Sequence, residues 1–176
     1  MRELKLGILA GIAALAGLAH AAAPAKSDAE LIASAQSAAP SSISADATVV
    51  TMDAAGNMRT VKQGSNGWTC MPGKTPMCAD PNGWEWNLAY MAHKPPPDKV
   101  GFMYMLKGGD DASNTDPYAK APAPGAHSII TGPHIMVLGP AVKLMPGYLK
   151  GADPDTSKPY VMWGGTPYEH LMIPAK

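Results

Sequence analysis

The heptapeptide VGFMYML, residues 100–106, alternates strictly between two kinds of side chain. Aromatic or branched aliphatic side chains occupy its even positions, and Met103 and Met105 occupy odd positions. Successive side chains of a β-strand point to opposite faces of a sheet, so this alternation predicts a strand with one thioether face. A fold built on a sheet follows from this segment, and related patterns recur further along the chain.

Two later segments place a histidine two residues before a methionine. His134 and Met136 share one face of a predicted strand, and His170 and Met172 share one face of another, because residues i and i+2 point the same way. Another short β-branched and aromatic segment contains Met162. The predicted strands in this half are residues 100–106, 134–138, 160–163 and 170–173.

The remaining elements complete an α+β fold. Segments 48–52, 58–62 and 68–70 are separated by turn residues and predict a β-meander. Ser27 and Glu30 have the spacing of a capping box, so a weakly packing, alanine-rich helix is expected from Asp28 to about Ala38.

A second helix is expected after Asp80, a good N-cap followed by Pro81, and it must end before Pro95. We therefore expect a small antiparallel sheet with two helices and long Gly/Pro-rich loops at 107–127 and 139–158. The expected organisation is a linker with a weak N-terminal helix at 24–46 and a single α+β domain at 47–176.

The first residues have the features of a cleaved secretory signal. Arg2 and Lys5 precede an apolar stretch at 6–19, and small residues at 19–21 or at 21–23 fit a cleavage site. The signal is expected to span residues 1–23. The apolar stretch is shorter than the ~20 residues that a membrane-spanning helix needs. We expect a periplasmic or extracellular protein with no stable membrane anchor after cleavage.

The chain has two cysteines, Cys70 and Cys78, with a Pro/Gly-containing segment between them that can turn back on itself. In an oxidising compartment an even pair at short spacing predicts a disulfide.

Composition restricts the function further. Lys and Arg number 14, Asp and Glu also number 14, and the net charge is zero. Without a basic surplus to neutralise phosphates, a general nucleic-acid binder is not expected. The chain has 12 methionines and a single phenylalanine, so methionine side chains must supply much of the buried apolar surface.

The His/Met faces predict a soft-metal site. Thioether sulfur and imidazole nitrogen suit Cu(I), and neither needs a free thiol. The candidate copper ligands are Met103, Met105, His134, Met136, His170 and Met172. The first interpretation is therefore an exported, non-enzymatic binding protein for a soft metal or another small ligand, with copper as the possible cofactor.

Other interpretations stay open. Methionine is a flexible core filler, so the same faces would also serve simple packing, and the four tryptophans offer either core or an aromatic groove. The loop Ser113–Asp116, with His134 or His170, would supply a nucleophile and base for an exported hydrolase, although no hydrolase signature occurs. A structural or interaction protein with no small-molecule site is the third alternative.

Several strings also occur together in a known set of proteins. They are GWTCMP at 67–72, SNTDP at 113–117, TGPHIM at 131–136 and PYVMWGGTPYEHLMIP at 159–174. In these strings the chain resembles a family of exported bacterial proteins with no established activity. The resemblance spans roughly residues 67–174 and implies an exported bacterial origin.

Overall fold

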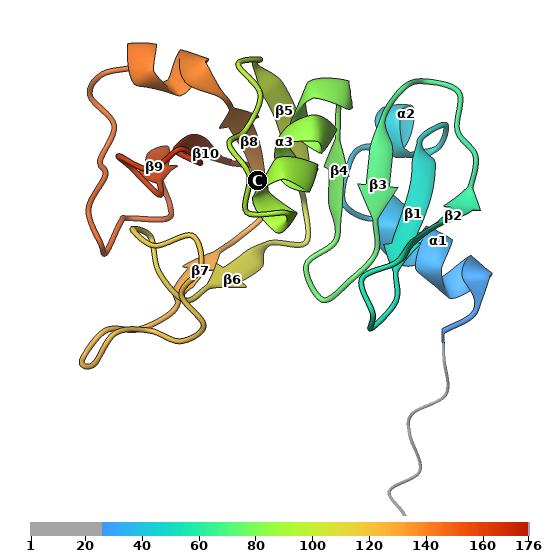
Figure 1. Cartoon of the computed structure of the whole chain (residues 1–176), viewed down its shortest axis with the longest axis horizontal. Coiled ribbons are helices and arrows are strands. Elements are labelled where there is room, and N and C mark those ends of the chain that lie inside the picture. Colours follow the sequence, from blue (N-terminus) through green and yellow to red (C-terminus); the bar gives the residue numbers. More distant parts are fainter. Residues whose placement is uncertain (1–25, 176) are drawn as a thin grey trace, which may run out of the picture.

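An eight-stranded sheet is the largest element of the computed structural model, which describes residues 26–175 (Figure 1). Its strand order is β2-β1-β3-β4-β5-β8-β10-β9. The strands are β1 (Thr48–Met52), β2 (Met58–Lys62), β3 (Thr69–Met71), β4 (Met77–Ala79), β5 (Gly101–Met105), β8 (His134–Leu138), β9 (Tyr160–Met162) and β10 (His170–Pro174). A separate two-stranded ribbon pairs β6 (Gly109–Asp111) with β7 (Ile129–Thr131). The predicted signal peptide, residues 1–23, lies outside the described residues.

The α+β class is confirmed, but the small antiparallel sheet is wrong in size and in strand direction. β1 pairs with β2 on one side, and the chain then crosses to the other side of β1. β3 consequently runs parallel to β1, with Thr48 opposite Thr69, and the sheet is mixed. The strands β4, β6 and β7 have three residues each, which is too short for an alternating pattern to show.

Both predicted helices form, together with two short ones that were not expected. The helices are α1 (Asp28–Gln36), α2 (Ser41–Ser44), α3 (Pro81–Met91) and the 3-10 helix η1 (Pro140–Leu144). At α1 the Ser27 hydroxyl accepts from the Glu30 amide at 3.3 Å and the Glu30 carboxylate accepts from the Ser27 amide at 2.8 Å. At α3 the Asp80 carboxylate accepts from the Gly83 amide at 2.7 Å.

The two longer helices cover opposite faces of the sheet. Ala35 of α1 is fully buried in a cluster with Cys70 and Cys78. Trp86 of α3 is buried in a different cluster, with Ala79 and Met103. Because Cys78 and Ala79 are adjacent on β4, their side chains point to opposite faces, and so the two clusters are separated by the sheet. The face under α3 is the one that carries the methionines.

The Cys70–Cys78 disulfide is present as predicted. The two cysteines lie directly opposite each other on β3 and β4 and are completely buried. This bond is compatible with an oxidising compartment.

Replacing both cysteines by alanine is expected to lower the free energy of unfolding by roughly 2 kcal/mol, because the short closed loop restricts the unfolded chain. Urea unfolding with and without a disulfide reductant measures the effect. The reductant should destabilise the natural protein and leave the Cys70→Ala/Cys78→Ala variant unchanged. Equal stability of the oxidised protein and the variant would contradict this prediction.

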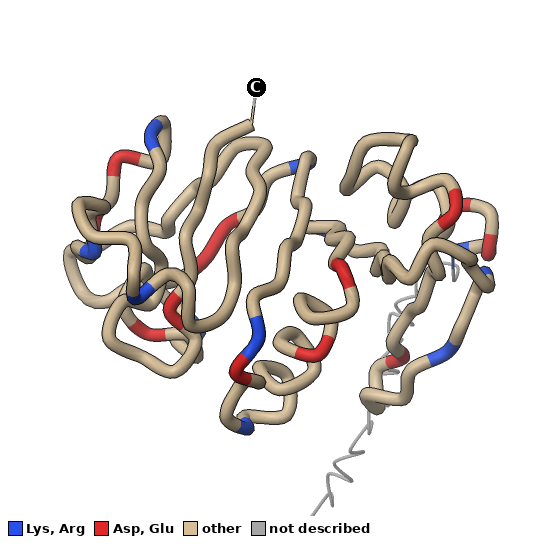
Figure 2. The backbone as a smooth tube through the Cα atoms, turned by 90° about the horizontal axis from the view of Figure 1, so that it is seen from above, with Lys and Arg blue, Asp and Glu red and all other residues tan. Residues whose placement is uncertain are grey.

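Acidic and basic residues are interspersed along the backbone, with no extended run of one sign in the view of Figure 2. None of the helices described between residues 26 and 175 is long and apolar enough to cross a membrane.

Candidate functional site

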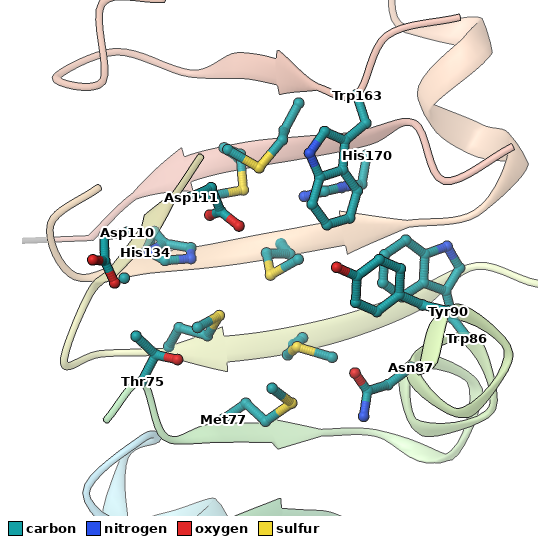
Figure 3. A pocket seen from close by; sticks show the side chains of 16 residues that line it. Thr75, Met77, Trp86, Asn87, Tyr90, Asp110, Asp111, His134, Trp163 and His170 are labelled. Carbon is teal, nitrogen blue, oxygen red and sulfur yellow. The ribbon is translucent and has the colours of Figure 1, made fainter. Parts of the chain in front are cut away.

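A cavity of about 200 Å³ lies between the sheet and α3, and thioether and imidazole groups line it (Figure 3). Its methionines and histidines are Met77, Met103, Met105, Met136, Met162, Met172, His134 and His170. All six candidate ligands from the sequence therefore surround one space. The structure adds Met77 from β4, which the sequence did not single out because its strand is so short, and Met162 from β9.

Strand register brings these side chains together. Met103, Met136 and Met172 lie opposite one another on the adjacent strands β5, β8 and β10 and form a central row. On one side of that row Met105 pairs with His134. On the other side His170 pairs with Met162. Side chains at i, i+2 positions of single strands thus form one continuous surface, because β5, β8, β10 and β9 are neighbours in this order.

Both histidines are held in the same tautomer. The Nδ1 of His134 lies 2.7 Å from the Gly132 carbonyl oxygen, and the Nδ1 of His170 lies 2.8 Å from the Tyr168 carbonyl oxygen. A carbonyl oxygen only accepts, so each Nδ1 carries the proton and each neutral ring keeps its lone pair on Nε2. The Nε2 of His170 is buried and has no hydrogen-bond partner among the described residues.

Burial keeps both rings neutral. His170 is completely buried, and the loss of hydration lowers its pKa to about 4 despite the hydrogen bond to Tyr168. Burial also lowers the pKa of His134, with the Gly132 hydrogen bond opposing the shift. The His170 lone pair is therefore available in neutral and mildly acidic solution.

Two carboxylates from β6 lie at the edge of the cavity. Asp110 pairs with the exposed Lys74 at 2.8 Å. Burial, together with the nearby charge of Asp110, raises the pKa of Asp111 to about 6. Within residues 26–175 no side-chain hydrogen bond or ion pair involves the Asp111 carboxylate, which reaches from β6 over the sulfur atoms in Figure 3. This acidic group was not among the candidate copper ligands, because the sequence placed it in a polar loop and not on a His/Met strand.

Aromatic rings close the end of the cavity near His170. Trp163 packs edge-on against the His170 ring with centroids 4.9 Å apart, and Trp86 does so at 5.5 Å. Tyr90 stacks on Trp163 at 5.1 Å. These contacts pack against the His170 ring and restrict its rotation.

Trp163 adopts an unusual backbone conformation, with φ of 55°. Residues other than glycine rarely occupy this region, so the surroundings must hold it there. Its amide donates to the Asn114 carbonyl at 2.7 Å and its indole Nε1 donates to the Ser113 carbonyl at 3.1 Å. The loop at 113–116 thereby positions an aromatic wall of the cavity.

The Ser113 hydroxyl of the same loop takes part in a local turn. The Ser113 hydroxyl accepts from the amides of Thr115 and Asp116 at 3.1 and 3.0 Å, as in a turn. Asn114 is completely buried, and its amide donates to the Gly151 and Val161 carbonyls. In the described part of the chain no hydrogen bond links this loop's hydroxyls to either cavity imidazole.

The donor set determines which ligands suit the cavity. In the part of the chain that the structure describes, no three His, Cys, Asp or Glu side chains converge as a metal site. The donors on the strand faces are thioethers and two imidazoles, a neutral and soft set, and the Asp110 and Asp111 carboxylates lie at its edge.

Comparisons of the chain with protein family models, with curated proteins and with solved structures gave no match. The site is therefore interpreted from its own geometry.

Proposed function

We propose that this protein is an exported, non-enzymatic binding protein for a soft monovalent metal ion, Cu(I), held by the His/Met cavity. Export rests on the predicted signal at residues 1–23 and fits the buried disulfide. The cavity supplies the ligands: His134 and His170 give imidazole nitrogen, and the methionines give thioether sulfur.

The single observation that carries this proposal is the Nε2 atom of His170. It is buried, lacks a hydrogen-bond partner among the described residues and belongs to a ring whose Nδ1 donates to a backbone carbonyl. Metal-bound histidines usually have this arrangement, because the carbonyl orients the ring and increases the basicity of the other nitrogen. A buried polar atom that makes no hydrogen bond costs folding free energy, and a bound metal ion would offset that cost.

The ligand type favours Cu(I) over other metals. Zn²⁺ sites use thiolates, imidazoles and carboxylates, and here both cysteines are joined in the disulfide. Mg²⁺ and Ca²⁺ need several oxygen ligands, whereas six of the sixteen residues that line the cavity are methionines. Pockets for organic ligands usually measure ~300–1,000 Å³, and this cavity of about 200 Å³ is smaller.

Titration of the purified protein with Cu(I), without oxygen and against a competing chromophoric chelator, tests the proposal. We expect a dissociation constant well below micromolar and at least a hundredfold loss in the His134→Ala/His170→Ala variant. His127→Ala is the matched control, since His127 is an exposed histidine whose side chain is 71% accessible and lies away from the cavity.

Affinity no better than micromolar in the natural protein would refute copper binding. Equal affinity in the double variant and in the His127→Ala control would show that the metal binds elsewhere. Circular dichroism of each variant confirms that the comparison is made between folded proteins.

A further inference from the structure

The strand positions of the two cavity histidines are offset along the sheet. His134 is paired with Pro174 of β10, and His170 lies four residues away on that same strand. At ~3.4 Å per residue, the two positions are separated by about 14 Å along the strand direction. Figure 3 accordingly shows the two rings at different ends of the sulfur-lined space.

Each histidine ring is also fixed through one of its nitrogens by a backbone hydrogen bond. The Nδ1 of each histidine donates to the carbonyl of residue i−2, at Gly132 and at Tyr168. This contact leaves Nε2 as the ring nitrogen that keeps its lone pair. In both strands residue i+2 is a methionine, Met136 or Met172.

A second methionine stands opposite each histidine. Met105 of β5 is the cross-strand partner of His134, and Met162 of β9 is that of His170. Directly opposed residues have Cα atoms ~4.5–5.5 Å apart. Flexible thioethers at these positions can therefore reach a metal ion that is bound to the ring nitrogen. The sheet therefore builds the same combination twice: an imidazole, the thioether two residues later and the thioether across the strand.

We propose that the cavity binds two Cu(I) ions, one in each of these sets. The His134 set consists of His134, Met136 and Met105, and the His170 set consists of His170, Met172 and Met162. This inference rests on the proposed function, because it assumes that the cavity takes a soft metal. Both sets are neutral, and the Asp111 carboxylate at the cavity edge supplies one negative charge, which offsets half of the charge of two monovalent cations.

The two sets can be disabled separately with little change of volume. Leucine fills nearly the same space as methionine but offers no sulfur ligand. Met105→Leu removes a ligand of the His134 set alone, and Met162→Leu removes one of the His170 set alone. Met58→Leu is the matched control, since Met58 lies on β2, outside the cavity, and is 42% exposed.

The experiment is an anaerobic Cu(I) titration of the full protein and these variants, followed by NMR of the histidine rings. We expect two equivalents in the natural protein, with His134 and His170 signals each responding to its own ion. Each single variant should bind one ion as before and the other at least ~10-fold more weakly. Met58→Leu should bind both ions unchanged.

The failures of the two proposals are distinguishable. A single equivalent that shifts both histidine signals together, and that is weakened alike by Met105→Leu and Met162→Leu, would overturn the two-ion arrangement while leaving copper binding intact. No submicromolar binding by the natural protein would overturn the proposed function itself, and the two-ion arrangement with it.

Discussion

Replacing Gly101 with alanine is expected to destabilise the protein by about 3 kcal/mol or more, because it overpacks a backbone contact. A Cβ atom at Gly101 would lie 2.3 Å from the Gly83 nitrogen and 2.7 Å from the Gly83 Cα. These are backbone atoms of the first turn of α3, so no side-chain rotation can relieve the clash. Either the helix or the strand has to move.

The displacement would also reach the candidate site. Trp86 and Tyr90 belong to α3 and form part of the cavity wall. We therefore expect Gly101→Ala to change the near-ultraviolet circular dichroism of the aromatic cluster and to weaken Cu(I) binding along with stability.

Chemical unfolding of Gly101→Ala beside Gly151→Ala gives a matched comparison. A Cβ at Gly151 would meet no atom within 4 Å, so that substitution should change stability by no more than ~0.5 kcal/mol. If the two variants were equally stable, the close packing of α3 on β5 would not be what holds the helix in place.

Asp111→Asn is expected to stabilise the protein by about 2 kcal/mol at pH 7.5 while weakening Cu(I) binding. Burial and the charge of Asp110 raise the pKa of Asp111 from 3.8 to about 6. At about 1.4 kcal/mol per pH unit, the ionised carboxylate then costs the folded state about 3 kcal/mol. The asparagine amide still has to be buried, which retains part of that cost.

The pH dependence has a definite sign. The folded protein binds the Asp111 proton more tightly than the unfolded chain, so this contribution to stability is complete below pH 3.8 and is lost as pH rises through 6. The gain from Asp111→Asn should therefore be largest above pH 7 and shrink toward pH 4.

The pH dependence that His170 contributes to stability has the opposite sign. Because its pKa falls from 6.5 to about 4 on folding, its contribution is complete above pH 6.5 and is lost as pH falls toward 4. Both proteins contain His170, so its effect cancels in their difference. Other groups around Asp111 are the carboxylate of Asp110 and the hydroxyls of Tyr90 and Tyr160. The Asp111 charge helps to raise the pKa of the two tyrosine hydroxyls.

Urea unfolding of the natural protein and Asp111→Asn between pH 4 and pH 8 measures this difference. Asp110→Asn is the control, because Asp110 is exposed and paired with Lys74, and we expect a change of no more than ~1 kcal/mol. A difference between the natural protein and Asp111→Asn that stays constant over this pH range would show that the Asp111 carboxylate is not responsible.

Local features of this protein were determined by its sequence. Alternation at 100–106, 134–138 and 170–173 placed the methionines and histidines on one face of their strands, because side-chain direction has a period of two in any strand. The capping groups of α1 and α3 and the cysteine spacing were likewise local, and the helices and the disulfide formed as expected.

Only the tertiary structure decided how those faces combine. Strand order is set by hydrogen bonds between segments far apart in the chain, such as β5 with β8 and β8 with β10, and no local pattern records it. No local pattern places Met77 or Asp111 at the cavity either, because Met77 lies on a three-residue strand and Asp111 lies in a segment expected to be loop. Trp86 reaches the cavity through the contact of α3 with Gly101. The sequence supplied the thioether and imidazole side chains, and the long-range pairing of the sheet gathered them around one cavity.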